Sequence, residues 1–148
     1  GNMRRTKLEK NILFLDEDNA CLSLMAESMA KHMGLPKIRV FSAGIRPGHI
    51  PPEVRRVLQE IGVELSGNTT KSMDQIPVND IDLVVSFGDA SEKCRSLPNK
   101  AKVERWAIPN PMRVADGTSA VLSAYRHGRD EIDKRVAALF LDHWRHLV

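Results

Sequence analysis

The chain is poor in cysteine and in aromatic residues: among 148 residues there are two cysteines, and Phe, Trp and Tyr together make up 5%. Cys21 and Cys94 cannot form the disulfide framework of a small secreted domain, so we expect both thiols to be reduced. No apolar run approaches the roughly 18 residues that span a bilayer. A signal-peptide-like apolar stretch is also missing near the start. These absences favour a cytoplasmic protein that contacts no membrane.

A strong charge of either sign is missing as well. The formal net charge is +3, and hydrophobic and charged residues make up 42% and 28% of the chain. These proportions are typical of a globular protein. The one basic run, Arg4, Arg5, Lys7 and Lys10, suits a solvated terminus, so no nucleic-acid partner is expected. The length fits a single domain over residues 1–148, with residues 1–10 loosely ordered, as a monomer or weak homodimer.

Four apolar segments have the pattern of buried strands, and helical periodicity separates them. The strands are expected at residues 11–16, 37–44, 82–87 and 102–108. The first helix has an apolar face at Leu22, Met25, Ala26, Met29, Ala30 and Met33, and Gly34 suits its end. A second helix starting at Pro51 and Pro52 would bury Val54, Val57, Leu58 and Ile61, and a third runs from about 119 to 144. The alternation predicts an α/β fold, a small three-layer sandwich around a four-stranded parallel sheet.

Ligands of open parallel sheets bind at the carboxyl ends of the strands, which are the loops after Leu15, Phe87 and Ile108 here. The first loop holds three acids, Asp16, Glu17 and Asp18. A phosphate-binding loop at this place needs glycine, basic residues and free backbone N–H groups instead. The loop therefore has the position of an anion site and the wrong charge for one.

Several motifs together resemble the low-molecular-weight protein tyrosine phosphatases and the related thioredoxin-coupled arsenate reductases. The resemblance covers nearly the whole chain. It is carried by "NILFL", "NACLSLMAE", "VFSAG", "GVELSGNTTKSMD", "DLVVSFGDASEKC", "KAKVERWAI" and "YRHGRDEID". It implies the phosphotyrosine phosphatase I-like fold. It also implies a loop of the form Cys-x5-Arg, in which a thiolate attacks and the Arg binds the oxyanion.

This sequence departs from the family at the positions that carry its chemistry. Asp16 stands at the position of the nucleophilic Cys, and Leu22 at that of the Arg. Asn110 replaces the general acid, an Asp that precedes a Pro. The first cysteine of the reductases' further redox pair aligns with Phe87, which leaves Cys94 alone. The resemblance thus predicts the scaffold of the family with a degenerate active site.

Positions that support the loop are retained, namely Asn19, Ser23, Ser42, Gly44, Ser66 and Lys71. Asn19 matches a family residue that braces the loop. Two like charges about 4 Å apart near a protein surface repel by several kcal/mol. We therefore expect a loop that has kept its shape, has lost its anion and does not bind phosphate or arsenate.

Two functional hypotheses follow. The first is a catalytically degenerate protein with a binding or regulatory role toward an unknown protein or small molecule, without a cofactor. The second is an enzyme with altered chemistry, in which Asp16 is an acyl-phosphate nucleophile and Asp18 the acid/base. Asp16, Glu17 and Asp18 would then bind Mg²⁺. A simpler interpretation of these acids is that Asp16 caps the following helix while Glu17 and Asp18 are solvated.

Two shorter motifs are similar to those of unrelated phosphoryl-transfer proteins. "FLDED" is similar to the Asp-x-Asp motif of haloacid-dehalogenase-like phosphatases, and "ILFLDEDN" to the acidic strand end of response-regulator receivers. A receiver needs an acceptor Asp where Phe87 stands, and the full-length resemblance disfavours both families.

The two cysteines allow two interpretations. Cys21 occupies a place where the family often has a second loop Cys, and Cys94 stands at the last redox position of the reductases. A Cys21–Cys94 disulfide is conceivable, but two separate reduced thiols are the preferred interpretation.

Overall fold

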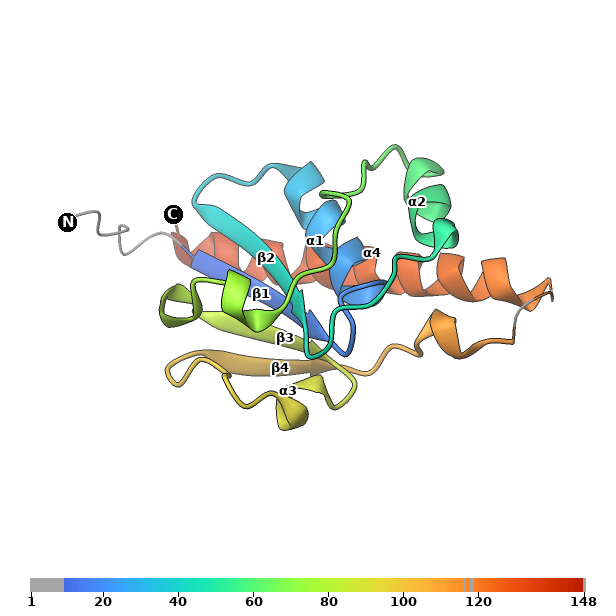
Figure 1. Ribbon diagram of the computed structural model, residues 1–148. Helices are drawn as coiled ribbons and strands as arrows, with labels where there is room; N and C mark the ends of the chain where they lie inside the picture. The colour runs from blue at the N-terminus through green and yellow to red at the C-terminus, as the bar shows by residue number, and fades with distance from the viewer. Residues whose placement is uncertain (1–9, 116, 118, 148) are drawn as a thin grey trace.

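The computed structural model describes residues 10–115, 117 and 119–147 (Figure 1). The expected loose ordering of residues 1–10 concerns residues outside this part, apart from Lys10. The strands are β1 (Lys10–Asp16), β2 (Ile38–Gly44), β3 (Leu83–Phe87) and β4 (Lys102–Trp106). The α-helices are α1 (Leu22–Met33), α2 (Pro52–Gln59), α3 (Ala90–Lys93) and α4 (Ala120–Leu147). Three short 3₁₀ turns are η1 (Met73–Gln75), η2 (Val78–Asp80) and η3 (Pro111–Arg113).

The strands form one parallel sheet in the order β2-β1-β3-β4, as predicted. Leu15 near the end of β1 lies beside Ala43 of β2 and Ser86 of β3. In the last pair, Phe87 of β3 lies beside Trp106 of β4. The carboxyl ends of all four strands therefore meet at one edge of the sheet, where a ligand site is expected.

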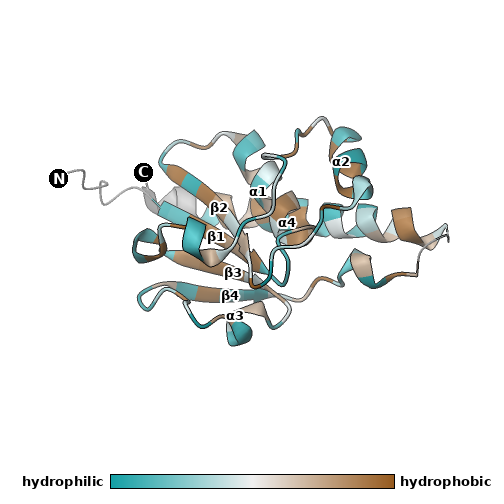
Figure 2. Ribbon diagram, in the orientation of Figure 1, coloured by the Kyte–Doolittle hydropathy of each residue, from teal (hydrophilic) through white to brown (hydrophobic). Residues whose placement is uncertain are grey.

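Helices cover the two faces of the sheet unequally. On one face, Ile12 and Phe14 of β1 pack into a large core with residues of α1, α2 and α4. On the other face, Leu13 and Leu15 pack against α3, η1 and η2 (Figure 1). Figure 2 shows the central strand β3 as mostly hydrophobic, in keeping with its burial on both sides. The predicted three-layer sandwich is confirmed, with one outer layer built from short elements.

The predicted end of α1 and start of α2 are confirmed, whereas α2 ends at Gln59, before the expected Ile61, and two side chains differ from expectation. Gly34 ends α1 with a left-handed φ of 63°, and Pro52 begins α2. Met33 and Ile61, expected on buried faces, are 42% and 41% exposed. Met33 belongs to the last turn of α1, and Ile61 follows the end of α2, so both extend past the core. β4 also ends at Trp106, two residues earlier than expected.

Within the described ranges, the structure contains no helix with the length and apolar character needed to cross a membrane.

Candidate functional site

A cleft of about 190 Å³ lies at the carboxyl ends of the strands. Four positions at which the sequence analysis expects the family's chemistry to be replaced line it, namely Asp16, Leu22, Phe87 and Asn110. Glu17, Asp18, Asp89 and Arg113 also belong to its lining. The fold therefore brings together residues that lie far apart in the sequence.

Asp16 ends β1 with a carboxylate that is buried beneath the loop. Its side-chain oxygen Oδ1 accepts a hydrogen bond from the backbone N–H of Asn19 at 2.6 Å, and Oδ2 accepts one from that of Ser23 at 2.9 Å. Burial raises the pKa of Asp16 to about 6, the negative charge of Asp18 adds to the rise, and the hydrogen bonds from Ser23 and Asn19 oppose it. The carboxylate thus binds donors at the start of α1, as an N-cap side chain does.

The other two acids of the loop have separate partners. Glu17 forms ion pairs with Arg46 and Lys93, each at 3.2 Å, and the hydrogen bonds from these two residues hold its pKa below the usual value. Asp18 Oδ1 accepts a hydrogen bond from the backbone N–H of Ala20 at 3.2 Å. The part of the chain that the structure describes contains no group of three His, Cys, Asp or Glu side chains that could hold a metal ion. The three carboxylates are thus near one another without forming a ligand set.

Asn19 braces the loop from inside. Its φ of 54° is left-handed, and its Nδ2 donates to Ser23 Oγ and to Ser42 Oγ, both at 2.9 Å. Its Oδ1 accepts from the backbone N–H of Lys71 at 2.8 Å. Gly44 passes so close that a Cβ there would lie 2.6 Å from the Asn19 nitrogen, which excludes any larger residue. These retained positions fix the loop's shape.

Glu27 of α1 extends this network and was missed by sequence reasoning. Its side chain is buried, and Oε1 accepts from Ser42 Oγ at 2.7 Å. Lys31 contacts Oε2 at 2.9 Å, and Lys71 contacts Oε1 at 3.4 Å. The available signal was a single charged residue inside the apolar repeat of α1. A buried carboxylate is expected to be paired, and this one joins α1, β2 and the segment before η1.

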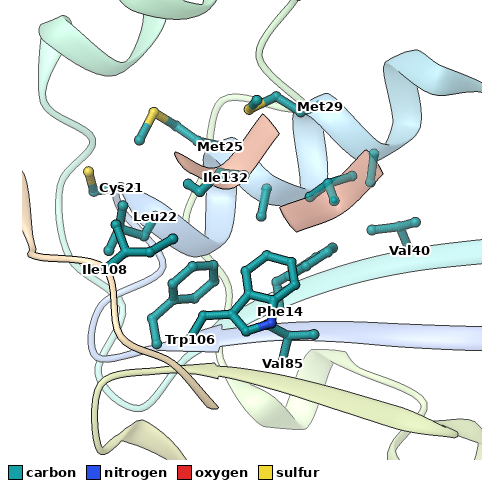
Figure 3. Packing of buried hydrophobic residues seen from close by; sticks show 14 of the residues in the cluster. Phe14, Cys21, Leu22, Met25, Met29, Val40, Val85, Trp106, Ile108 and Ile132 are labelled. Carbon is teal, nitrogen blue, oxygen red and sulfur yellow. The ribbon is translucent and has the colours of Figure 1, made fainter. Parts of the chain in front are cut away.

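Leu22, which we expect at the position of the family's Arg, has an apolar side chain that is packed in the structure. A Cβ built on Gly128 of α4 would lie 3.3 Å from Leu22 Cδ2 and 3.4 Å from Pro111 Cγ. Leu22 is 4% exposed and lies near Ile108 at the end of the core (Figure 3). The side chain of Leu22 is therefore packed against α4.

Phe87 and Asn110 also have structural partners. The Phe87 ring lies 5.8 Å from Trp106, at an interplanar angle of 88°, and 6.4 Å from Phe14. Trp106 is buried, as predicted, and its ring lies 5.9 Å from that of Phe14 in the core (Figure 3). Asn110 Oδ1 accepts from the backbone N–H of Met112 at 3.0 Å and so begins η3. Phe87 thus belongs to an aromatic cluster, and the amide of Asn110 caps η3.

Both cysteines are free thiols, and they lie on opposite faces of the sheet. Cys21 is buried in the core beneath α1, α2 and α4, whereas the half-buried Cys94 packs with the cluster on the other face. Burial raises the pKa of Cys21, and the charges of Asp16, Asp18 and Glu53 add to this effect. The structure agrees with two separate thiols.

Arg113 is a further residue of the cleft, and no sequence pattern singled it out. It ends η3, and it is the single basic side chain among the described residues that line the cleft. Asp89, the N-cap residue of α3, lines the same cleft from the loop after β3. The lining therefore carries more negative than positive groups around the apolar side chains of Leu22, Phe87 and Ile108.

Comparisons with known proteins agree with this geometry. A sequence model of the family described as low molecular weight phosphotyrosine protein phosphatase matches residues 11–146. An arsenate reductase of Bacillus subtilis is 34% identical over 128 residues, which cover 86% of this chain and 92% of the relative. An arsenate reductase of Bacillus licheniformis is 36% identical over 131 residues, with coverage of 86% and 93%.

Solved structures of an arsenate reductase and an arginine phosphatase have folds similar to that of this chain. An arsenate reductase in an oxidized state has a TM-score of 0.76 and 27% identity, over 90% of this chain and 98% of that one. An arginine phosphatase from Geobacillus stearothermophilus has a TM-score of 0.76, over 93% and 94% of the two chains, and at 20% identity it supports the fold alone. From the matched residues and the shared fold, the chain belongs to the low molecular weight phosphotyrosine protein phosphatase family, which includes arsenate reductases among its close relatives.

Proposed function

We propose that this protein is a catalytically degenerate member of its family that binds a partner at the strand-end cleft and has no phosphatase or arsenate reductase activity. One observation carries the proposal: every replaced side chain in the cleft is engaged in the structure. Asp16 binds loop N–H groups, and Asn110 caps η3. Leu22 packs near Gly128, and Phe87 packs on Trp106.

No accessible thiol lies among the described residues that line the cleft, and its one basic side chain, Arg113, comes from η3 and not from the loop after β1. Phosphoryl transfer by this family needs a thiolate nucleophile, and Cys21, the cysteine closest in sequence to Asp16, is buried with a raised pKa. An oxyanion also needs donors that are free to bind it. Two loop donors, from Asn19 and Ser23, are already bound to Asp16. The excess of acids in the lining favours a neutral or positively charged group of a partner over phosphate or arsenate.

The composition of the chain is the basis for the partner and the cellular compartment that we propose. The partner is a protein or a small molecule in the cytoplasm, and binding needs neither a metal nor a redox cofactor. The relatives are named arsenate reductases, and the resemblance implies that this activity uses cysteines at positions where we expect this chain to have Asp16 and Phe87.

The test is a thermal-shift series on the purified protein with phosphate, arsenate, Mg²⁺ and Ca²⁺ in parallel, together with an aryl-phosphate hydrolysis assay. A ligand that binds the folded state raises Tm by mass action. We expect no shift with either oxyanion and no hydrolysis above buffer. Hydrolysis that disappears in Asp16→Ala, or a saturable shift with phosphate or arsenate, would contradict the proposal.

A second candidate is a metal-dependent phosphatase with Asp16 as nucleophile. It is favoured by one observation, that the Asp16 carboxyl lines the cleft with a pKa of about 6. Against it, both oxygens of Asp16 already accept backbone hydrogen bonds. This candidate predicts that Mg²⁺ with beryllium fluoride or aluminium fluoride stabilises the protein, because these fluorides imitate a phosphoryl group on a carboxylate. The absence of any such shift would remove it.

A further inference from the structure

We propose that the carboxylate of Asp16 is the resident anion of its own loop: it occupies the backbone donors that a bound oxyanion would use, and so keeps these donors closed to an external anion. This inference rests on the proposed function, because it explains how the loop keeps its shape without an external anion.

The carboxylate of Asp16 is bound in the way that a separate anion would be. Asp16 is 7% exposed, and each of its two oxygens accepts one backbone N–H, from Asn19 at 2.6 Å and from Ser23 at 2.9 Å. Short hydrogen bonds from backbone N–H groups to an anion are the contacts by which such loops bind oxyanions. Asp16 therefore makes within the chain the contacts that a separate anion makes from outside.

No basic side chain neutralises this carboxylate in the described part of the chain. None of the ion pairs there includes Asp16, whereas Glu17 and Glu27 each have two basic partners. A buried charge is normally paired with an opposite charge. At Asp16 the loop donors and the start of α1 provide the compensation, as they would for a bound anion.

The shape of the loop depends on other residues. Asn19 joins Ser23, Ser42 and Lys71, and Gly44 makes the close approach to Asn19. None of these contacts involves the Asp16 side chain. Removing the carboxylate should therefore leave the conformation of the loop unchanged. The space of the carboxylate would be vacant, and the backbone N–H groups of Asn19 and Ser23 would be free to bind an anion.

The experiment compares wild-type protein with Asp16→Ala and with the matched control Asp18→Ala. The control also removes one negative charge from the same loop, but it leaves the contacts of Asp16 with Asn19 and Ser23 in place. Thermal unfolding is followed at pH 7.5 with 0–50 mM formate, sulfate or phosphate, at an ionic strength held constant with sodium chloride. Circular dichroism verifies that each variant is folded.

We expect Asp16→Ala to gain a saturable rise in Tm of about 2–5 °C with these anions, as weak millimolar binding would give. Wild-type protein and Asp18→Ala should show no such rise. A folded Asp16→Ala variant without an anion effect would overturn the inference. An equal gain in Asp18→Ala would overturn it too, because the effect would then come from charge removal alone.

If Asp16→Ala does not fold, the wild-type protein and Asp16→Asn decide the question by NMR. In a pH titration of wild-type protein, the chemical shifts of the Asn19 and Ser23 amide protons should change together, because both donate to the Asp16 carboxylate. Neither shift should change in this way in Asp16→Asn. Amides that do not respond to pH would overturn the inference. Hydrolysis of an aryl phosphate by wild-type protein would instead contradict the proposed function and leave the contacts of Asp16 with its loop unaffected, so the two failures are distinguishable.

Discussion

Oδ2 of Asp16 accepts a hydrogen bond from the backbone N–H of Ser23 at 2.9 Å, across seven residues of chain. The contact joins the last residue of β1 to the first turn of α1. It places a carboxylate where other members of the family are expected to have a sulfur nucleophile. Because the group is buried and close to Asp18, its protonation state affects the stability of the whole loop.

The first prediction concerns this protonation. The pKa of Asp16 rises from an ordinary 3.8 to about 6 in the folded protein, so the folded state binds the proton more tightly than the unfolded state. The contribution of Asp16 to stability is then largest below pH 4, and it falls as pH rises through 6, by at most about 3 kcal/mol.

Urea unfolding of wild-type protein and Asp16→Asn at pH 4.5 and 7.5 tests this linkage. Other acids, such as Glu17, have lowered pKa values and act in the opposite direction, so the difference between the two proteins is the quantity to compare. Stability of wild-type protein relative to Asp16→Asn should decrease toward pH 7.5. Two pH profiles that run parallel would show that Asp16 does not titrate in this way.

The second prediction is that Phe87 is a packing residue. Phe87→Ala should lower the free energy of unfolding by about 3 kcal/mol, because a large ring is lost from a well-packed cluster. Val103→Ala on β4 is the control: Val103 is 44% exposed, so its loss should cost under about 1 kcal/mol. Denaturant unfolding measures both. A similar small effect for the two variants would mean that the Phe87 ring is not held by Trp106 and Phe14.

The third prediction concerns the buried carboxylate of Glu27. Glu27→Ala removes the acceptor of Ser42 Oγ and the partner of Lys31 and Lys71, and we expect a loss of about 2–4 kcal/mol. Glu92→Ala is the matched control, since Glu92 forms an exposed ion pair with Arg105 at 3.0 Å. Exposed pairs contribute about 0–1 kcal/mol. Equal losses in the two variants would contradict the role of Glu27 in bracing the loop.

The fourth prediction concerns thiol reactivity. Cys94 is half-buried, whereas Cys21 is buried with a raised pKa. Iodoacetamide at pH 8 should therefore modify Cys94 well before Cys21, because the thiolate is the reactive form and must be accessible. Mass spectrometry of the labelled peptides gives the two rates, with labelling in urea as the reference. In Cys94→Ser the native protein should hardly react; rapid labelling of Cys21 there would show that the core opens readily.

The sequence alone determined the parallel α/β fold, because its signals are local. Apolar runs such as Ile12–Leu15 report a strand buried on both faces, and Gly34 marks the end of α1 by its own backbone preference. The order of the motifs indicated the family, and it predicted the positions at which the family's catalytic residues are replaced. Helix periodicity erred at Met33 and Ile61, since it cannot tell where the neighbouring layer ends.

The tertiary structure decided what the replaced residues do. Sequence reasoning offered Asp16 as a helix cap and Glu17 and Asp18 as solvated acids. In the structure Asp16 binds Asn19 and Ser23, whereas Glu17 forms ion pairs with Arg46 and Lys93. Which donors each carboxylate meets depends on how β2, α3 and the start of α1 pack around the loop. The sequence specifies the side chains and their order, whereas partners from distant segments are set only when the sheet and its helices come together in space.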